Sequence, residues 1–363
     1  MKNVTFIVAD INFGGGGERV VANMSNYFTN HFNYNIEIIS FGPYNPNLFY
    51  PIDKKIKIKY LNIEQANSGV FSNFISKIRT FKKLDVHIKN YQGKHIVLGI
   101  GTYPNILLSL INKSNLIKIG CEHNSFKSVS LFWSFIRKFL YKKLNATISL
   151  TKTDLINLTK ISKKCFVIPN ARTFTSDIKV YKKENKRLLA IGRISYQKGY
   201  NYMLDVFEKL SMHVKDWNLR IVGDGPLRSW LINEIKKRNL QNRITLIYPS
   251  KNITKEYLES SIYLMTSRYE GLPMVLLEAQ AFGLPIISFN CATGPSDIIN
   301  DGEDGFLIEP FNVDMMVNKL IKLIEDENLQ MLFSKNAILN SKKFSEEKIY
   351  SKWKNVFNEL ENI

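Results

Sequence analysis

The first half of the chain alternates short apolar runs rich in β-forming residues with segments of helical periodicity. A helix is predicted at residues 18–29. Strands are predicted at residues 4–9, 36–40, 95–100, 117–121 and 146–150. Strands that alternate with helices form a parallel sheet with helices on both faces. The pattern therefore predicts a doubly wound α/β domain over residues 1–172.

A second series of the same kind follows a polar and charged segment, residues 173–186, which has the composition of a linker. Further strands are predicted at residues 188–191, 219–222, 244–247, 262–265 and 285–288. We therefore expect a second Rossmann-like domain over residues 187–345. Two such sheets in tandem leave a central cleft where the carboxyl ends of their strands face each other, which is the usual ligand position.

Length and composition support two globular domains. A chain of 363 residues exceeds one typical hydrophobic core, and 45% hydrophobic residues argue against extensive disorder. The three scattered cysteines form no metal-binding spacing, which is typical of reduced thiols in a cytoplasmic protein. The apolar run at the start is too short for a secretory signal, and we expect no membrane-spanning segment.

The positive charge is concentrated in the first half. Residues 1–172 hold 24 Lys and Arg against 8 Asp and Glu, a net charge of +16, whereas residues 173–363 carry only +2. This asymmetry indicates an anionic partner for the first half: nucleic acid, an anionic membrane surface or a phosphorylated substrate. Charge alone does not choose among them.

The most informative segment is SRYEGLPMVLLEA, residues 267–279. Pro273 is predicted at the first position of a helix, which places Glu270 on the loop before it and Glu278 in its first two turns. A helix N-terminus attracts anions. Glutamates are most often surface residues, but an unpaired Glu278 within an apolar stretch would be costly. Two carboxylates around an anion site suit a sugar nucleotide, with phosphate at one point and hydroxyls on either side.

A basic loop follows the first strand of the second half. GRISYQKG, residues 192–199, carries Arg193 and Lys198, which could hold a diphosphate and neutralise the charge that grows on it as a leaving group. A solvated basic loop is the alternative. The position opposite Glu270 at the same sheet edge favours a binding role.

Two features of the first half also lie at strand ends. The glycine run 14–17 would let the backbone approach a phosphate or sugar, although it matches neither a dinucleotide fingerprint nor a P-loop, and a mobile turn is the alternative. His123 lies in the polar cluster CEHNS; a lone histidine is more often structural, so its functional and structural interpretations stay open.

Aromatic and basic residues are interleaved over residues 126–144. This composition is typical of a helix that binds a membrane interface, whereas packing of its apolar side on the sheet is the structural alternative. Arg79, Lys82 and Lys83 add a second basic cluster. Several such charges, at about 1 kcal/mol each on an anionic leaflet, would suffice for peripheral attachment.

No Asp-x-Asp occurs at a predicted strand end, so a metal bridging a sugar diphosphate has no obvious ligands. We therefore expect no divalent-metal requirement and no cofactor, with the nucleotide sugar acting as a substrate.

Taken together, the motifs resemble family 4 glycosyltransferases, which are retaining, sugar-nucleotide-dependent enzymes with the two-Rossmann GT-B fold. The resemblance covers essentially the whole chain. Its carriers are FGGGGERVV, CEHNS, VIPNA, GRISYQKG, VGDGPLR, SRYEGLPMVLLEA and GPSDIINDGEDGFLI. The Glu-x7-Glu segment together with the Arg/Lys loop is highly specific, whereas the glycine run alone is weak. Within the family, the chain resembles bacterial enzymes that extend undecaprenyl-diphosphate-linked oligosaccharides for O-antigen, capsule or protein glycans.

The resemblance implies roles for the second half. Glu270 would contact the donor sugar, and the amides of Gly271 and Leu272 would bind its hydroxyls or the phosphate. Glu278 would bind the ribose hydroxyls. The remaining pair, Arg193 and Lys198, would hold the diphosphate.

For the first half, the resemblance implies that the backbone of Gly15 and Gly16 approaches the diphosphate and that His123 hydrogen-bonds the sugar near the reaction centre. The last helix, in residues 346–363, would cross back to the first domain. The chain departs from the pattern at Tyr248-Pro249-Ser250, where relatives often carry a glycine after the third strand of the second domain. This position lies near the nucleobase, which puts the identity of the base in doubt. Leu272 replaces a frequent phenylalanine.

We therefore expect a metal-independent glycosyltransferase that acts at the inner face of the cytoplasmic membrane. It would move a hexose or N-acetylhexosamine from a nucleotide diphosphate, UDP most readily, to a lipid-diphosphate-linked glycan. A sugar-nucleotide epimerase of the same architecture is an alternative, and it would form product from the donor alone. A nucleic-acid-binding protein would fit the basic charge, but the chain has no compact recognition motif, so we expect no nucleic acid.

Overall fold

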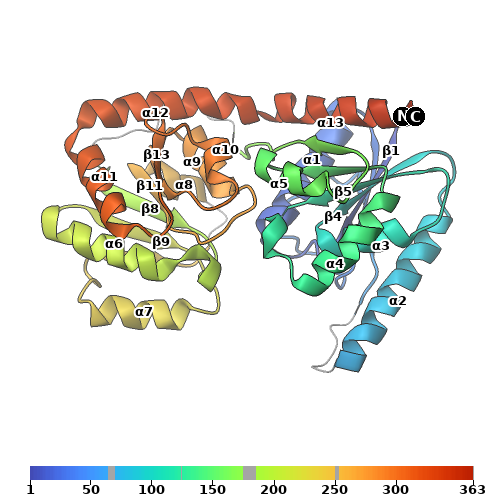
Figure 1. Ribbon diagram of the computed structural model, residues 1–363, viewed down its shortest axis with the longest axis horizontal. Coiled ribbons are helices and arrows are strands. Elements are labelled where there is room, and N and C mark those ends of the chain that lie inside the picture. The colour runs from blue at the N-terminus through green and yellow to red at the C-terminus, as the bar shows by residue number, and fades with distance from the viewer. Residues whose placement is uncertain (64–69, 124, 175–184, 250–252, 363) are drawn as a thin grey trace. The chain divides into compact units, whose positions relative to one another are not determined.

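The computed structural model describes residues 1–363 except 64–69, 124, 175–184, 250–252 and 363, and gives no side-chain surroundings for residues 70–74 and 127. The chain divides into two compact units (Figure 1). The first comprises Met1–Ala171 and Glu346–Ile363, and the second comprises Arg172–Ser345. The linker predicted at residues 173–186 falls largely outside the described residues. In the described part of the chain, no helix is long and apolar enough to cross a membrane.

The first unit contains a seven-stranded parallel sheet in the order β3-β2-β1-β4-β5-β6-β7. Its strands are β1 (Asn3–Val8), β2 (Asn35–Ser40), β3 (Lys57–Tyr60), β4 (His95–Ile100), β5 (Leu116–Glu122), β6 (Ala146–Ser149) and β7 (Cys165–Val167). Five of these strands were predicted from the sequence. The two that were missed, β3 and β7, are the short, incompletely buried edge strands, which lack a continuous apolar run.

Helices cover this sheet and include the last helix of the chain. They are α1 (Gly16–His31), α2 (Val70–Lys89), α3 (Thr102–Leu110), α4 (Leu131–Leu140), α5 (Lys152–Leu158) and α13 (Glu346–Glu361), with 3-10 turns η1 (Phe126–Ser128) and η2 (Tyr141–Lys143). The ring of Phe28 on α1 lies 5.5 Å from that of Tyr350 and 5.8 Å from that of Phe357. These aromatic contacts attach α13 to α1, so the C-terminal helix packs within the first unit (Figure 1).

The second unit contains a six-stranded parallel sheet in the order β10-β9-β8-β11-β12-β13. Its strands are β8 (Arg187–Ile191), β9 (Asn218–Val222), β10 (Ile244–Ile247), β11 (Ile262–Met265), β12 (Ile286–Phe289) and β13 (Gly305–Ile308). The strand order reverses between β8 and β11. Ligands of open α/β sheets bind at the carboxyl ends of the strands at such a switch point.

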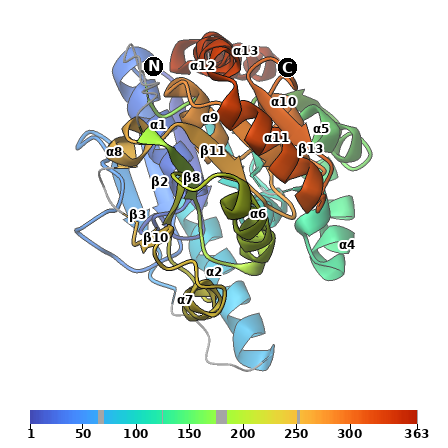
Figure 2. The same ribbon diagram turned by 90° about the vertical axis from the view of Figure 1, so that its left-hand side faces the viewer.

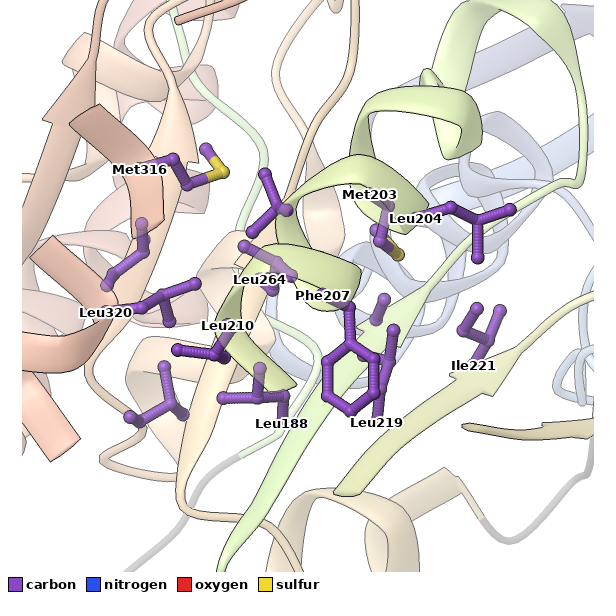
Figure 3. Packing of buried hydrophobic residues seen from close by; sticks show 14 of the residues in the cluster. Leu188, Met203, Leu204, Phe207, Leu210, Leu219, Ile221, Leu264, Met316 and Leu320 are labelled. Atoms are coloured by element: carbon purple, nitrogen blue, oxygen red, sulfur yellow. The ribbon is translucent and has the colours of Figure 1, made fainter. Parts of the chain in front are cut away.

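The helices of this unit are α6 (Tyr200–His213), α7 (Arg228–Lys237), α8 (Ile253–Leu258), α9 (Met274–Ala281), α10 (Pro295–Ile298), α11 (Val313–Glu325) and α12 (Glu327–Ser341), with 3-10 turns η4 (Tyr196–Lys198) and η5 (Lys342–Phe344). Helices α6 and α11 lie side by side against the sheet (Figure 2). Phe207 and Leu210 of α6 pack over Leu188 and Leu219 of the strands, as Figure 3 shows. This apolar contact holds α6 in place, and with it the loop that precedes α6.

Candidate active site

The loop after β8 and the loop after β11 touch backbone to backbone at the switch point. Gly199 has φ +65°, a left-handed conformation that favours glycine, and a Cβ built there would lie 2.1 Å from the carbonyl oxygen of Thr266. The Thr266 hydroxyl donates to the Gly199 carbonyl at 3.2 Å. The close approach requires glycine, and it fixes the position of the Arg/Lys loop relative to the loop that carries Glu270.

Lys198 and Glu270 meet at this point. Lys198 Nζ lies 2.6 Å from Glu270 Oε1, and the two side chains are only 18% and 7% exposed. The Thr293 hydroxyl donates to the Glu270 carbonyl oxygen, and Gln197 Nε2 donates to the carbonyl of Tyr269 at 3.0 Å. Little water screens an ion pair at this depth. The carboxylate is therefore held in one place with a cation beside it.

Arg193 lies on the same loop and is exposed to solvent. The segment after β9 also packs closely against this loop. A Cβ at Gly223 would lie 2.1 Å from the Gly192 carbonyl oxygen. Ile194 donates its backbone N–H to the Asp224 carbonyl at 2.8 Å. The structure thus places both predicted cations at the switch point, one paired with Glu270 and the other open to solvent.

Arg268 is a residue of this site to which no role was assigned from the sequence. Its guanidinium donates from Nη1 to the Tyr196 carbonyl at 2.6 Å and from Nη2 to Asn201 Oδ1 at 2.8 Å. It also stacks 4.0 Å from the centre of the Tyr196 ring. Arg268 therefore ties the Glu270 loop to η4 and α6. The position of Arg268 inside the motif SRYEG could have indicated a role in the site. Its contacts join residues far apart along the chain, so the sequence pattern could not predict them.

The helix predicted after Glu270 is α9, and Pro273 is the residue before its first turn, with ψ 107°, instead of the first helical residue as predicted. The segment before α10 packs closely against this turn: Gly294 has φ +98°, and a Cβ there would lie 2.4 Å from the Gly271 carbonyl oxygen. Leu272 is buried, at 5% exposed. Its apolar neighbours fix the start of α9 just after the Glu270 loop.

Glu278 lies in α9 and is completely buried. The Tyr257 hydroxyl donates to its Oε2 at 2.7 Å, and the Tyr257 ring stacks on Phe282 with centres 5.0 Å apart. The sequence predicted that this carboxylate needs a partner, and Tyr257 is such a partner within the protein. Sequence reasoning did not identify Tyr257. The ribose-binding role of Glu278 stays a prediction.

The glycine run begins α1 of the first unit. Gly15 caps the helix in an ordinary extended conformation, with φ −86°, and Gly16 is the first helical residue. A Cβ at Gly17 would meet no atom within 4 Å. A Cβ at Gly15, by contrast, would lie 2.4 Å from Glu18 Oε2, so a larger residue there would require the Glu18 side chain to move. The donor contact of Gly15 and Gly16 stays a prediction.

His123 lies directly after β5 and lines a small hollow within the first unit. The hollow is bounded by α1, by the ends of the central strands and by α13, and its lining includes Val20, Met24, Asn170, Tyr350 and Trp353. Burial lowers the pKa of His123 to about 4. The imidazole is therefore neutral at physiological pH, and it can act as a hydrogen-bond donor or acceptor but not as a cation.

A buried polar network surrounds Glu122, the residue that precedes His123 in the sequence. Glu122 accepts from the Thr102 hydroxyl at 3.0 Å and from the hydroxyl of Tyr141. Asn105 Nδ2 donates to the same Tyr141 oxygen at 3.2 Å. Burial raises the pKa of Glu122, and these hydrogen bonds oppose the rise. The network fixes the end of β5 from which His123 projects. No sequence pattern indicated it, since its members are far apart along the chain.

Comparison with known proteins gives the family. The model of the family "Glycosyl transferases group 1" matches residues 172–340. The amylovoran biosynthesis glycosyltransferase AmsD of Erwinia amylovora is 31% identical over 99% of this chain and 100% of its own length. The chain belongs to the group 1 glycosyltransferases.

Two further relatives extend the comparison. One is the Campylobacter jejuni enzyme named GalNAc-alpha-(1->4)-GalNAc-alpha-(1->3)-diNAcBac-PP-undecaprenol alpha-1,4-N-acetyl-D-galactosaminyltransferase, which is 25% identical over the full length of both chains. The other is a solved structure of a mutant of Staphylococcus aureus TarM in complex with fondaparinux, alpha-GlcNAc-glycerol and UDP. It superposes with a TM-score of 0.84 at 18% identity, covering 99% of this chain and 100% of the other. The fold of the glycosyltransferase is therefore GT-B, as predicted.

Replacing Lys198 by alanine should reduce turnover by roughly 10²–10³-fold and weaken donor binding less. A preorganised positive charge beside the leaving group acts mainly in the transition state, when negative charge develops there. Steady-state kinetics with varied donor would measure both effects. Lys209→Ala is the matched control, since Lys209 forms an exposed pair with Asp314 at 2.5 Å elsewhere in the unit. Turnover near the wild-type value in Lys198→Ala would refute the role.

The neutral state of His123 should appear in the pH dependence of stability. Between about pH 6.5 and pH 4 the unfolded imidazole binds a proton that the folded one does not, so the free energy of unfolding falls as the pH falls through this window. In His123→Gln this fall should be smaller by roughly 2 kcal/mol. Urea unfolding of both proteins at pH 7 and pH 4.5 measures it. Identical losses in the two proteins would show that His123 is not buried neutral.

Proposed function

We propose that this glycosyltransferase moves a hexose or N-acetylhexosamine from a UDP-sugar to an undecaprenyl-diphosphate-linked glycan, with retention of configuration, in surface polysaccharide biosynthesis. Support for the pathway comes from the relative named for amylovoran biosynthesis, and support for the acceptor from the Campylobacter jejuni relative named for an undecaprenol-linked glycan. The TarM mutant was solved in complex with UDP, which supports the choice of base. The enzyme would act peripherally at the inner face of the cytoplasmic membrane.

The observation that carries the proposal is the Lys198–Glu270 pair at the β8/β11 switch point. A donor diphosphate placed there would take Lys198 and Arg193 as counter-charges and share the cation with Glu270. Glu270 would then accept hydrogen bonds from hydroxyls of the donor sugar, and the amides of Gly271 and Leu272 would bind the sugar or the phosphate. Glu278 would bind the ribose hydroxyls.

In the transfer itself, the bond between the anomeric carbon and the diphosphate oxygen breaks and a bond to the acceptor oxygen forms on the same face. The acceptor proton passes to the departing phosphate oxygen, so no protein base is required. Lys198 and Arg193 stabilise the negative charge that grows on that oxygen. The neutral imidazole of His123 would hydrogen-bond the sugar, and the backbone of Gly15 and Gly16 would approach the diphosphate.

The test is transfer from a panel of radiolabelled nucleotide sugars onto lipid-extracted acceptors, with and without a chelator. We expect label on the lipid fraction from a UDP-sugar, an anomeric configuration in the product identical to that of the donor, and turnover unchanged by the chelator. NMR of the product glycan gives the configuration. Inversion would exclude the retaining mechanism, loss of turnover with chelator would exclude metal independence, and product formed from the donor alone would indicate an epimerase.

A further inference from the structure

Helix α4 presents four large apolar side chains to solvent. Leu131 is 90% exposed, Phe135 is 65% exposed, Phe132 is 63% exposed and Phe139 is 58% exposed. Their spacing along α4 places them on adjoining turns of one side of the helix. We call these four residues the α4 face. Single exposed apolar residues are ordinary, but a continuous patch of this kind marks an interaction surface.

The opposite side of α4 packs the helix onto the first unit, and the four residues of the α4 face take no part in this packing. Trp133, Ile136 and Leu140 pack against the core of the first unit. Arg137, at 1% exposed, donates from Nη2 to the Phe126 carbonyl at 2.6 Å and lies over the Phe126 ring. The packing interpretation of the sequence is therefore confirmed for the inner side of the helix, and the membrane interpretation stays a prediction for the outer side. Because the inner side fixes the orientation of α4, the α4 face is left for a partner.

The charged residues of the segment that contains the α4 face all have one sign. Residues 126–144 contain no Asp or Glu. Lys138 and Lys142 are exposed at the C-terminal end of the helix, and Lys77 of α2 lies 4.8 Å from the centre of the Trp133 ring. Like charge around the patch disfavours a second copy of this chain, whereas it complements an anionic lipid surface. Bulky apolar residues beside lysines are the composition of helices that lie in a membrane interface.

We propose that the α4 face inserts into the headgroup region of an anionic leaflet and brings the first unit to its lipid-linked acceptor. The inference rests on the proposed function for the acceptor, but the surface and its lipid partner follow from exposure and charge alone. Phe132 and Phe135 would enter the leaflet, and Lys138 and Lys142 would remain at its charged surface.

The test is co-sedimentation with vesicles of phosphatidylcholine alone and of phosphatidylcholine with phosphatidylglycerol. The wild type should bind the anionic vesicles, less so at high salt, and Phe132→Ser/Phe135→Ser should bind at least tenfold more weakly. The matched control is Leu332→Ser/Leu339→Ser on α12, where the two side chains are 51% and 53% exposed, and it should bind like the wild type. Thermal melts check that both variants are folded.

A second readout separates this proposal from the proposed function. Transfer to a detergent-solubilised acceptor should be unchanged in Phe132→Ser/Phe135→Ser, whereas transfer to acceptor in vesicles should fall. Undiminished vesicle binding by that variant would overturn the proposal. So would a wild-type dimer in solution that the variant abolishes, because the α4 face would then be a contact between copies. A wild type that binds vesicles but transfers no sugar would reject the proposed function and leave this surface standing.

A separate observation concerns Tyr248, the first residue of the segment Tyr248-Pro249-Ser250 at which the chain departs from the family pattern; Ser250 lies outside the described residues. Its ring is 63% exposed just after β10, and the Arg228 guanidinium lies over it, 3.7 Å from the ring centre. Arg228 Nη1 donates to the Gly223 carbonyl at 2.6 Å, which anchors the guanidinium to the end of β9. The result is a flat, solvent-facing surface at the carboxyl edge of the sheet.

This surface lies along the same sheet edge as the Lys198–Glu270 pair. The strand order β10-β9-β8 places the end of β10 two strands, or about 10 Å, from the end of β8. A ribose separates a nucleobase from its diphosphate over a comparable span. We infer that Tyr248, steadied by Arg228, is the stacking platform for the donor nucleobase. The inference rests on a nucleotide donor at Lys198.

Calorimetric titration with UDP and with inorganic pyrophosphate tests it. Tyr248→Ala should weaken UDP binding by roughly five- to hundredfold, the range for loss of one stacked base, and leave pyrophosphate binding unchanged. Tyr248→Phe keeps the ring and should bind UDP like the wild type. Equal UDP affinity in wild type and Tyr248→Ala would reject the platform. Failure of the wild type to bind either ligand would instead reject the donor site itself.

Discussion

The site of this enzyme depends on the close approach of two loops at the point where the second sheet changes direction. Gly199 lets the backbone of the β8 loop lie against that of Thr266, and this contact brings Lys198 to 2.6 Å from Glu270. A larger residue at Gly199 would force the loops apart, because the obstacle is backbone and cannot swing away. The ion pair is well shielded from water, so its geometry is set before any ligand arrives. Preorganised charge of this kind is what stabilises a developing anion most effectively.

The two units differ in net charge and in the kind of residues that they present. The second unit holds Arg193 and Lys198 at one sheet edge, where a diphosphate would be held under the proposed function. The first unit carries most of the net charge, and its α4 face adds exposed aromatic residues to that charge. Its buried network around Glu122 fixes the strand end that bears His123, while burial keeps that histidine neutral. A neutral hydrogen-bonding group suits contact with sugar hydroxyls, and surface lysines suit anionic lipid.

The sequence predicted most of the fold because buried parallel strands are continuous apolar runs. Ten strands were found within one or two residues, whereas β3, β7 and β13 at the sheet edges were missed. Motif spacing also predicted that Lys198 and Glu270 lie close together, since both follow neighbouring strands at their carboxyl ends. The partners that hold the site could not be predicted: Tyr257 reaches Glu278 across 21 residues, and Tyr141 reaches Glu122 across 19. Such contacts depend on packing between elements, which no local pattern records.

Under the proposed function, protein cations and no bound metal ion hold the donor diphosphate. The most direct measurement is calorimetric titration of the wild-type enzyme with UDP and with UMP in the presence of a chelator. We expect UDP to bind at least about tenfold more tightly than UMP, because the second phosphate adds a charge-assisted contact worth about 1.5–3 kcal/mol. Equal affinities, or UDP binding that returns only when a divalent cation is added, would contradict it.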